Sequence, residues 1–324
     1  MSIAKPCLIV VPAGKVGHER LCRGVAERLQ VDADVVVVAR RSLADLLAPR
    51  RRLGDLMSQA RQPERRLLLA SGRRAVLVAR AIAALPPPRP FVAALGASGV
   101  ATRHFDFVWT SVHDRLKPAP NVLATLTTPH QLTAADLAVR GAAFAAAHAE
   151  LPRPWIAVLI GGPNGAFRFG DAETAEIATA LTTLANSHGG SLLVTASRRT
   201  GQANRRRLAE RLAGAPVFFW DGGGDNPLAG MLGAADFLVV TCDSINMVSE
   251  AVSTGKPVYL WPLPGGSAKF DRFHEGLQRH GAVRWFDGGL DRWRYDPVDA
   301  TLSVAEEIAR RLGGDGRTAA AATA

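Results

Sequence analysis

The chain is poor in the features that mark secreted, membrane-spanning and disulfide-linked proteins. Its 324 residues contain three scattered cysteines, so the sequence predicts neither a disulfide framework nor a cysteine metal cluster. No apolar run approaches the roughly 20 residues that a membrane-spanning helix needs. The apolar run near the N-terminus ends at Pro12 and is typical of a strand rather than of a signal peptide. These absences predict a cytoplasmic protein.

Several common catalytic motifs are also missing. HExxH, CxxC and GxSxG do not occur, which argues against zinc proteases, thiol redox proteins and α/β-hydrolases. Lys256 is not a P-loop lysine, because Glu250 stands where that motif needs its first glycine and Pro257 replaces its Ser/Thr. The triplet 32–34 (Asp-Ala-Asp) resembles a metal-binding DxD, but it enters a predicted strand instead of leaving one. We expect no metal and no cofactor.

Short apolar runs alternate with helical patterns along the chain, which predicts a parallel α/β architecture. Two prolines in the segment LPRPW at 151–155 interrupt the pattern and indicate a linker. We therefore predict two doubly wound, Rossmann-like domains at 1–150 and 151–312, facing a central cleft, and a disordered tail at 313–324. The expected strands are 7–11, 34–39, 66–70, 91–95, 105–109, 122–126, 156–160, 192–195, 217–220, 237–240, 258–260 and 284–286. The expected helices are 19–29, 43–47, 73–83, 134–149, 172–187, 203–212, 228–233, 245–252, 271–280 and 298–312.

The positive charge is concentrated in the first half. Residues 1–150 contain 21 Lys/Arg against 11 Asp/Glu, whereas residues 151–324 contain 18 of each. Most of the excess lies in 40–80, which favours an anionic membrane surface or a lipid-linked acceptor as partner, and a peripheral location at the inner face of the membrane. A merely solvated basic face is the plain alternative. Nucleic acid is a weaker candidate, because this stretch has no aromatic side chains to stack on bases.

The segment 235–262 carries the strongest signal for a ligand. It reads as a buried strand, a polar turn, a short helix and a second strand. Asp243 and Ser244 stand where the helix begins, and a helix N-terminus suits a diphosphate. Asn246 and Met247 lie in its first turn, and Glu250 could accept hydrogen bonds from ribose hydroxyls. An ordinary helix cap explains the same residues equally well.

Other loops that follow predicted strands could complete a nucleotide-sugar site. A glycine-rich loop follows the first strand of the second half, and a Ser-Arg-Arg run follows the next strand. Glycine backbone and arginine side chains both suit phosphate groups. Lys269, on a later helix, could help to position the donor; with Arg272 and His274 it is expected on the face away from the core. The residues predicted in the two loops are Gly161, Gly162, Asn164, Arg168, Ser197, Arg198 and Arg199.

The loop after the first strand supplies the candidate catalytic residues. Gly14 and Gly17 permit a tight turn and a close approach of a ligand to the backbone. His18 is the best candidate for a general base, because its near-neutral pKa suits removal of a proton from an acceptor hydroxyl. Glu19 is a second candidate. An exposed or capping histidine is the alternative.

Several stretches resemble one family. GGPNGAFRFG, TASRRT, DSINMVSEAVSTGKPVY and KFDRFHEGL are similar to segments of the plant elongated-mitochondria fission factor family and its bacterial members. SGRRAVLVARAI and FDFVWTSVHDRL are similar as well. The resemblance implies an α/β, GT-B-like fold, inverting and metal-independent sugar transfer, and a sugar-nucleotide site at Ser244 to Glu250. The loop GKVGHER is similar to that of lipid-linked N-acetylglucosaminyltransferases, which would place His18 in acceptor activation.

Three functions stay open. The first is a glycosyltransferase that moves a sugar from a nucleoside-diphosphate donor to a membrane-associated acceptor. The second is a non-catalytic adaptor of the same fold that binds a membrane or a protein. The third is a sugar-nucleotide epimerase. The Arg/Ala-rich composition is typical of a bacterial protein, so the mitochondrial role of the plant relatives is not expected to transfer.

Overall fold

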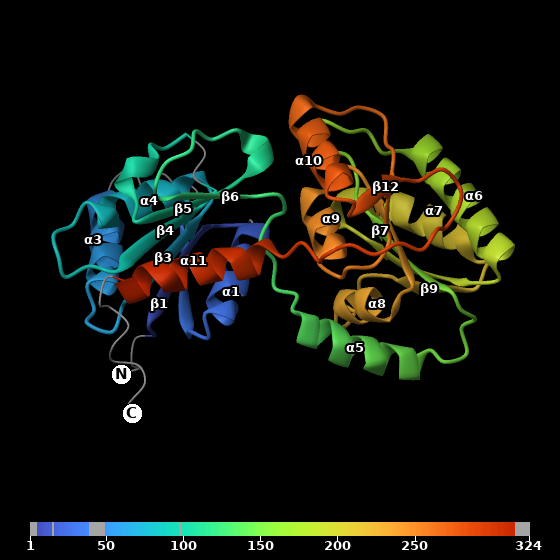
Figure 1. The fold of residues 1–324 in the computed structure, drawn as a ribbon, viewed down its shortest axis with the longest axis horizontal. Helices are drawn as coiled ribbons and strands as arrows, with labels where there is room; N and C mark the ends of the chain where they lie inside the picture. Colours follow the sequence, from blue (N-terminus) through green and yellow to red (C-terminus); the bar gives the residue numbers. More distant parts are fainter. Residues whose placement is uncertain (1–4, 15, 39–48, 97–98, 315–324) are drawn as a thin grey trace. The chain divides into compact units, whose positions relative to one another are not determined.

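The computed structural model describes residues 5–14, 16–38, 49–96 and 99–314, except for the side chains of 49–53 and 314. The chain forms two compact units, one of residues 1–131 with 300–324 and one of residues 132–299. Each unit is a parallel sheet covered by helices (Figure 1).

The first unit contains a six-stranded parallel sheet in the order β2-β1-β3-β4-β5-β6. Its four central strands, β1, β3, β4 and β5, are buried, as expected for a sheet covered on both faces, whereas the edge strands β2 and β6 are partly exposed. Their bounds are β1 Cys7–Pro12, β2 Ala33–Val38, β3 Leu67–Ser71, β4 Phe91–Leu95, β5 Phe107–Ser111 and β6 Val122–Thr125.

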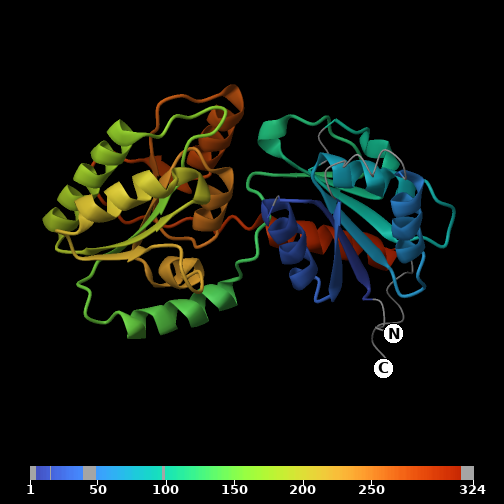
Figure 2. The same cartoon turned by 180° about the vertical axis from the view of Figure 1, so that it is seen from behind.

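Helices cover both faces of this sheet. Side chains of α1 (Val16–Arg28) and α11 (Ala300–Gly314) pack with Ile9 and Leu69 on one face. Side chains of α3 (Pro49–Ala60) and α4 (Arg73–Ala83) pack with the alternate residues of β1 and β3 on the other face (Figure 2). Two 3-10 turns, η1 Thr102–His104 and η2 Val112–Asp114, flank β5.

The second unit repeats this plan in the order β12-β11-β10-β7-β8-β9. Its helices again lie on both faces, with α6 and α7 packed in one core cluster and α5 and α8 in another. The strands are β7 Trp155–Ile160, β8 Ser191–Ala196, β9 Val217–Trp220, β10 Phe237–Thr241, β11 Val258–Trp261 and β12 Val283–Trp285. The helices are α5 Ala134–Ala147, α6 Asp171–His188, α7 Gln202–Leu212, α8 Leu228–Ala234, α9 Ile245–Val252 and α10 Ala268–Arg279, with a 3-10 turn η3 at Arg198–Thr200.

Both strand orders are doubly wound, which confirms the predicted α/β architecture. Each order reverses at one place: between β1 and β3 in the first sheet, and between β7 and β10 in the second. In open parallel sheets, ligands bind beyond the carboxyl ends of the strands at this reversal. The loops after these four strands are therefore the places to look for function.

The division into units differs from the predicted boundary between residues 150 and 151. Helix α5 belongs to the second unit, because Gly141 lies directly against Gly233 of α8, where a Cβ atom would be 2.6 Å from the carbonyl carbon of Gly233. Helix α11 returns to the first unit, where the Thr301 hydroxyl bonds both the amide and the carbonyl of His130. The predicted helix at 43–47 and the predicted disorder at 315–324 fall outside the described residues, whereas 313–314 end α11.

Candidate functional site

The reversal point of the second sheet brings two predicted loops together. Strands β7 and β10 are hydrogen-bonded neighbours, so Gly161 and Gly162 after β7 lie beside Asp243 and Ser244 after β10. The Gly161 amide donates to Thr241 Oγ1 at 2.7 Å, and the Gly162 amide donates to Asp243 Oδ2 at 3.0 Å. The two loops therefore form one hydrogen-bonded edge.

Asp243 lies beneath this edge rather than on its surface. Its side chain has no exposed area, and Oδ2 is 2.7 Å from the Arg199 guanidinium. Oδ1 is buried and accepts no hydrogen bond within the part of the chain that the structure describes. A Cβ atom at position 161 would stand 2.1 Å from Oδ1, so only glycine fits there. Asp243, expected to face the ligand, instead holds the two loops in place.

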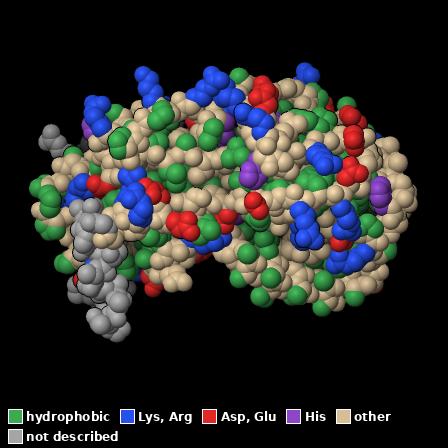
Figure 3. Space-filling model, viewed as in Figure 1, with side chains coloured by type: hydrophobic (Ala, Val, Ile, Leu, Met, Phe, Trp, Pro, Cys, Tyr) green, Lys and Arg blue, Asp and Glu red, His purple; other side chains and the backbone are tan. Residues whose placement is uncertain are grey.

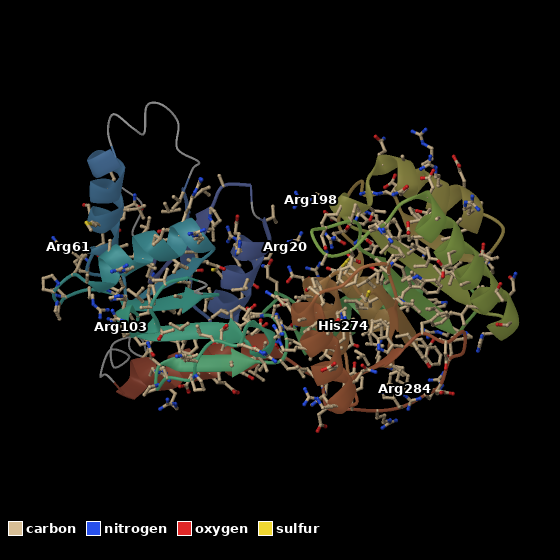
Figure 4. All side chains as sticks on the ribbon, turned by 90° about the horizontal axis from the view of Figure 1, so that it is seen from above. Arg20, Arg61, Arg103, Arg198, His274 and Arg284 are labelled. Carbon is tan, nitrogen blue, oxygen red and sulfur yellow. The ribbon has the colours of Figure 1, made fainter. Side chains whose placement is uncertain are left out.

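The loop after β7 is held by side chains of its own segment and of β8. Asn164 donates through Nδ2 to the Asp243 carbonyl and accepts the amides of Ala166 and Phe167 through Oδ1. Ser197 Oγ donates to the Gly161 carbonyl at 2.8 Å. Asn164 and Ser197 thus shape the loop, and the exposed basic residues at this edge are Arg168, Arg198 and Arg199 (Arg198 is labelled in Figure 4).

The N-terminus of α9 opens at the same edge. Ser244 is its N-cap, and its hydroxyl accepts the Met247 amide at 3.4 Å. Asn246 is exposed, and Met247 and Glu250 are half-buried. Amide groups of the first helical turn attract an anion, and Glu250 lies on the helical face of Asn246 and Met247, at i+4 and i+3. This arrangement suits the diphosphate and ribose of a nucleotide.

His274 of α10 is buried against the same segment, which corrects its expected place on the solvated side of the helix. It is 3% exposed, and Nε2 donates to the Cys242 carbonyl at 2.9 Å. Burial lowers the pKa of His274, so the neutral ring with its proton on Nε2 is the form that fits. Lys269, one turn earlier, is exposed. His274 therefore supports the loop before α9, while Lys269 remains on the surface.

The reversal point of the first sheet contains His18. Its Nδ1 atom lies 2.9 Å from the hydroxyl of Ser71, the last residue of β3. That hydroxyl donates to the Leu95 carbonyl at 2.8 Å and is buried. Since a serine hydroxyl has one proton, it must accept from Nδ1–H, and the neutral ring then carries its lone pair on Nε2. Sequence analysis missed Ser71, and no local pattern marks it.

The other predicted residues of this loop are placed differently. Glu19 forms an ion pair with Arg23 at 2.8 Å, one turn along α1. Gly14 has a φ of 73°, a left-handed value that favours glycine. Gly17 is an exposed residue of the first turn of α1. His18 is thus the predicted residue of this loop whose ring is oriented by a buried hydroxyl.

The arginine-rich stretch 40–80 is not one uniform face. Arg65 is buried, donates to the Lys5 and Cys7 carbonyls, and pairs with Asp34 at 2.6 Å. Arg40 and Arg41 and the side chains at 50–52 lie outside the described residues. On the side of the molecule in Figure 3, basic side chains lie in separate groups, some beside acidic ones. The exposed members of the stretch are Arg61, Arg66, Arg73, Arg74 and Arg80.

Lys256 is a second residue whose role the sequence did not predict. The segment Gly-Lys-Pro reads as a helix stop, and the structure adds that Nζ donates to three carbonyls at the end of α8, those of Leu232, Gly233 and Ala235, at 2.9, 2.5 and 2.7 Å. The sequence feature that could have indicated this role is a single lysine just before a buried strand. Lys256 ties α8 to β11.

Two absences apply to the described part of the chain. It contains no group of three or more His, Cys, Asp or Glu side chains that could hold a metal ion. It also contains no helix that is both long and apolar enough to cross a membrane.

Solved structures with the same fold include MurG of Acinetobacter baumannii, with a TM-score of 0.50 and 15% identity over 96% of this chain and 92% of that one. UDP-GlcNAc 2-epimerase of Methanocaldococcus jannaschii has a TM-score of 0.59 and 10% identity, over 95% and 99%. A glycosyltransferase of Rickettsia africae has a TM-score of 0.53 and 11% identity, over 97% and 90%. These likenesses show a GT-B fold with two Rossmann-like units.

Sequence comparison gives the family. The chain is 32% identical over 279 residues to the mitochondrial fission protein ELM1 of Arabidopsis thaliana, an alignment that covers 77% of this chain and 64% of that relative. The chain thus spans less than two thirds of the length of that relative. The family model described as Mitochondrial fission ELM1 matches residues 16–312, so the chain belongs to the mitochondrial fission ELM1 family.

Proposed function

We propose that this chain is a metal-independent, inverting glycosyltransferase that uses a nucleoside-diphosphate sugar as donor. The observation that carries the proposal is the edge at the reversal of the second sheet. There, the N-terminus of α9 opens beside Gly161 and Gly162, and Glu250 follows on the same helix. The amides suit the diphosphate, and the Glu250 carboxylate suits the two ribose hydroxyls.

The first unit supplies the base in this proposal. His18 Nε2 accepts the proton of an acceptor hydroxyl, and the acceptor oxygen forms a bond to the anomeric carbon of the sugar. The bond from that carbon to the diphosphate breaks, and the diphosphate leaves with both electrons. Ser71 keeps the ring in the required tautomer. Each substrate atom is accounted for without a metal or a cofactor.

The acceptor in this proposal is anionic or linked to a lipid. The exposed arginines Arg61, Arg66, Arg73, Arg74 and Arg80 favour a protein that works at the inner surface of an anionic membrane. Flotation with vesicles that contain anionic lipid tests this part separately from the chemistry.

A thermal-shift screen against UDP, GDP, CMP and TDP and their sugars, with and without magnesium, tests the proposal. A ligand at 100 times its Kd stabilises a protein by about 2.7 kcal/mol, so one nucleotide series should raise the Tm clearly. Turnover on membrane extracts with the sugar donor should follow, with free nucleoside diphosphate as product. A sugar nucleotide returned with inverted C2 would indicate the epimerase, and no shift with any nucleotide would leave the adaptor.

A further inference from the structure

A polar cavity lies in the first unit, at the edge of the sheet opposite to His18. The cavity, here called the amino-edge cavity, has a volume of about 350 Å³. Its walls come from the last turns of α4, from the segment before β4 and from the segment before β5. Its charged and aromatic lining residues are Arg80, Arg89, Arg103, His104, Phe105 and Asp106.

The walls of the cavity are held in place by contacts of their own. Arg89 binds the Asp106 carboxylate through two bonds of 2.5 and 2.9 Å, and that carboxylate also accepts the Val92 amide at 2.8 Å. The Asn121 amide group donates to the carbonyls of Thr102 and Phe105, on either side of Arg103 and His104. The cavity is therefore built before any ligand arrives.

The charges of the cavity do not balance. Asp106 is the acidic residue of the lining, and Arg89 already neutralises it. Arg80 and Arg103 form no ion pair with any residue that the structure describes, and both are exposed to the cavity mouth. The end of α4 adds a partial negative charge of roughly half a unit, which the two guanidinium groups outweigh.

His104 reports the same excess of positive charge. Its pKa is lowered, first by burial and then by the charges of Arg80 and Arg103. A planar guanidinium pair beside a neutral imidazole matches a phosphate group, which accepts paired hydrogen bonds from arginine. A bound dianion would offset the two charges that His104 senses.

We propose that the amino-edge cavity binds a phosphate group through the side chains of Arg80 and Arg103. The site is separate from the candidate base, because its residues precede β4 and β5, whereas His18 follows β1 and Ser71 ends β3. Figure 4 shows Arg103 and Arg20 toward opposite ends of the first unit, with Arg20 on α1. The phosphate can belong to a soluble ion or ester, or to a phosphomonoester lipid headgroup.

The first test is a titration with inorganic phosphate at low ionic strength, followed by the ring proton resonance of His104. The His104→Gln variant assigns that resonance. Phosphate should move it saturably and raise the pKa of His104. Arg80→Gln and Arg103→Gln should each weaken phosphate binding by about tenfold, since each removes charge-assisted hydrogen bonds. Arg206→Gln, at an exposed arginine of α7 in the second unit, should bind as the wild type does.

A further measurement decides where the phosphate comes from. Vesicles of phosphatidylcholine with phosphatidate that sediment with the wild type, but not with Arg80→Gln or Arg103→Gln, would identify a lipid source; phosphate binding without vesicle binding would identify a soluble one. Either result supports the site. An unmoved His104 resonance, or an equal loss of affinity in Arg206→Gln, overturns it.

Discussion

His18 and Ser71 come from segments 53 residues apart, yet their side chains form a hydrogen bond of 2.9 Å at the reversal point of the first sheet. The Ser71 hydroxyl is in turn fixed on the Leu95 carbonyl at 2.8 Å. This chain from a backbone carbonyl through a hydroxyl to Nδ1 sets the proton of the neutral ring on one nitrogen. It gives the imidazole the orientation and tautomer that a general base needs.

Replacing Ser71 by alanine should therefore lower turnover without weakening donor binding. We expect kcat to fall by about fivefold, because one orienting hydrogen bond contributes about 1 kcal/mol. The ¹⁵N shifts of the His18 ring should also lose their preference for the Nδ1–H form. Ser111→Ala, at a buried serine that ends β5, is the matched control. Wild-type turnover together with an unchanged tautomer would remove Ser71 from the mechanism.

Glu250 tests the donor site independently of turnover. Glu250→Ala should weaken binding of the donor nucleotide by about 1–3 kcal/mol, because a ribose hydroxyl loses its charged acceptor. Calorimetry with the nucleotide that gives the largest thermal shift measures this directly. Glu275→Ala, at an exposed glutamate of α10, should leave the affinity unchanged. Equal affinities for wild type and Glu250→Ala would contradict the ribose assignment.

We expect Asp243 to contribute to the stability of the folded chain rather than directly to ligand binding. Asp243→Asn removes the charge that pairs with Arg199 and that accepts the Gly162 amide. Arg199 is 38% exposed, so water can solvate it, and we expect the free energy of unfolding to fall by about 1–3 kcal/mol. Urea unfolding measures this change.

Asp291→Asn is the control for that experiment, because its pair with Arg284 is exposed. It should change the free energy of unfolding little. If the two variants were equally stable, the buried carboxylate would not be what holds the two loops.

Local patterns predicted most of the fold. The expected strands at 91–95 and 217–220 and the expected helices at 73–83 and 245–252 match the structure at both ends. These segments combine continuous apolar runs or helical periodicity with clear turn residues, so neighbouring residues alone define them. Helix α3 was missed because its start is dominated by arginines, although Leu56, Met57 and Ala60 in its second half pack on the sheet.

Contacts between distant residues could not be predicted in this way. The return of α11 to the first unit depends on Thr301 and His130, which are 171 positions apart. The loops that bear the candidate donor residues were found, because they follow strands. The buried position of Asp243, which was expected to face the ligand, was not predicted, because it depends on the space left by Gly161 and on Arg199 in the turn η3 after β8.

The position of His274 depends both on a local pattern and on a contact between distant residues. Phe270, Phe273 and Leu277 form an apolar stripe on α10, and position 274 lies within the same stripe at i+4 and i+1. His274 was nevertheless assigned from the sequence to the opposite side with Lys269 and Arg272, although its spacing fits the stripe. The ring can be buried because its N–H group donates a hydrogen bond to the Cys242 carbonyl.

The buried His274 makes a prediction about pH. Its pKa in the folded chain is lowered from the ordinary value of 6.5, mainly by burial, so the unfolded chain binds the proton more readily. Stability is therefore fully present above about pH 6.5 and is lost as the pH falls below that value. Acidic groups affect stability only at lower pH. Hydrogen bonds from Arg310 and Arg311 lower the pKa of Glu307 to about 2, so the contribution of Glu307 to stability is lost only below about pH 4.5. The Tm of the wild type should thus decline between pH 6.5 and 5.

His274→Gln keeps an N–H donor but cannot take up this proton. The Tm of this variant should therefore change less between pH 6.5 and 5 than the Tm of the wild type, even if it is lower at pH 8. His280→Gln, at the exposed C-cap of α10, should show the same dependence of Tm on pH as the wild type. Melting curves at half-unit steps of pH separate the three proteins. A wild-type slope that persists in His274→Gln would show that other groups control the acid sensitivity of this unit, and that the buried imidazole is not what couples proton uptake to the loop before α9.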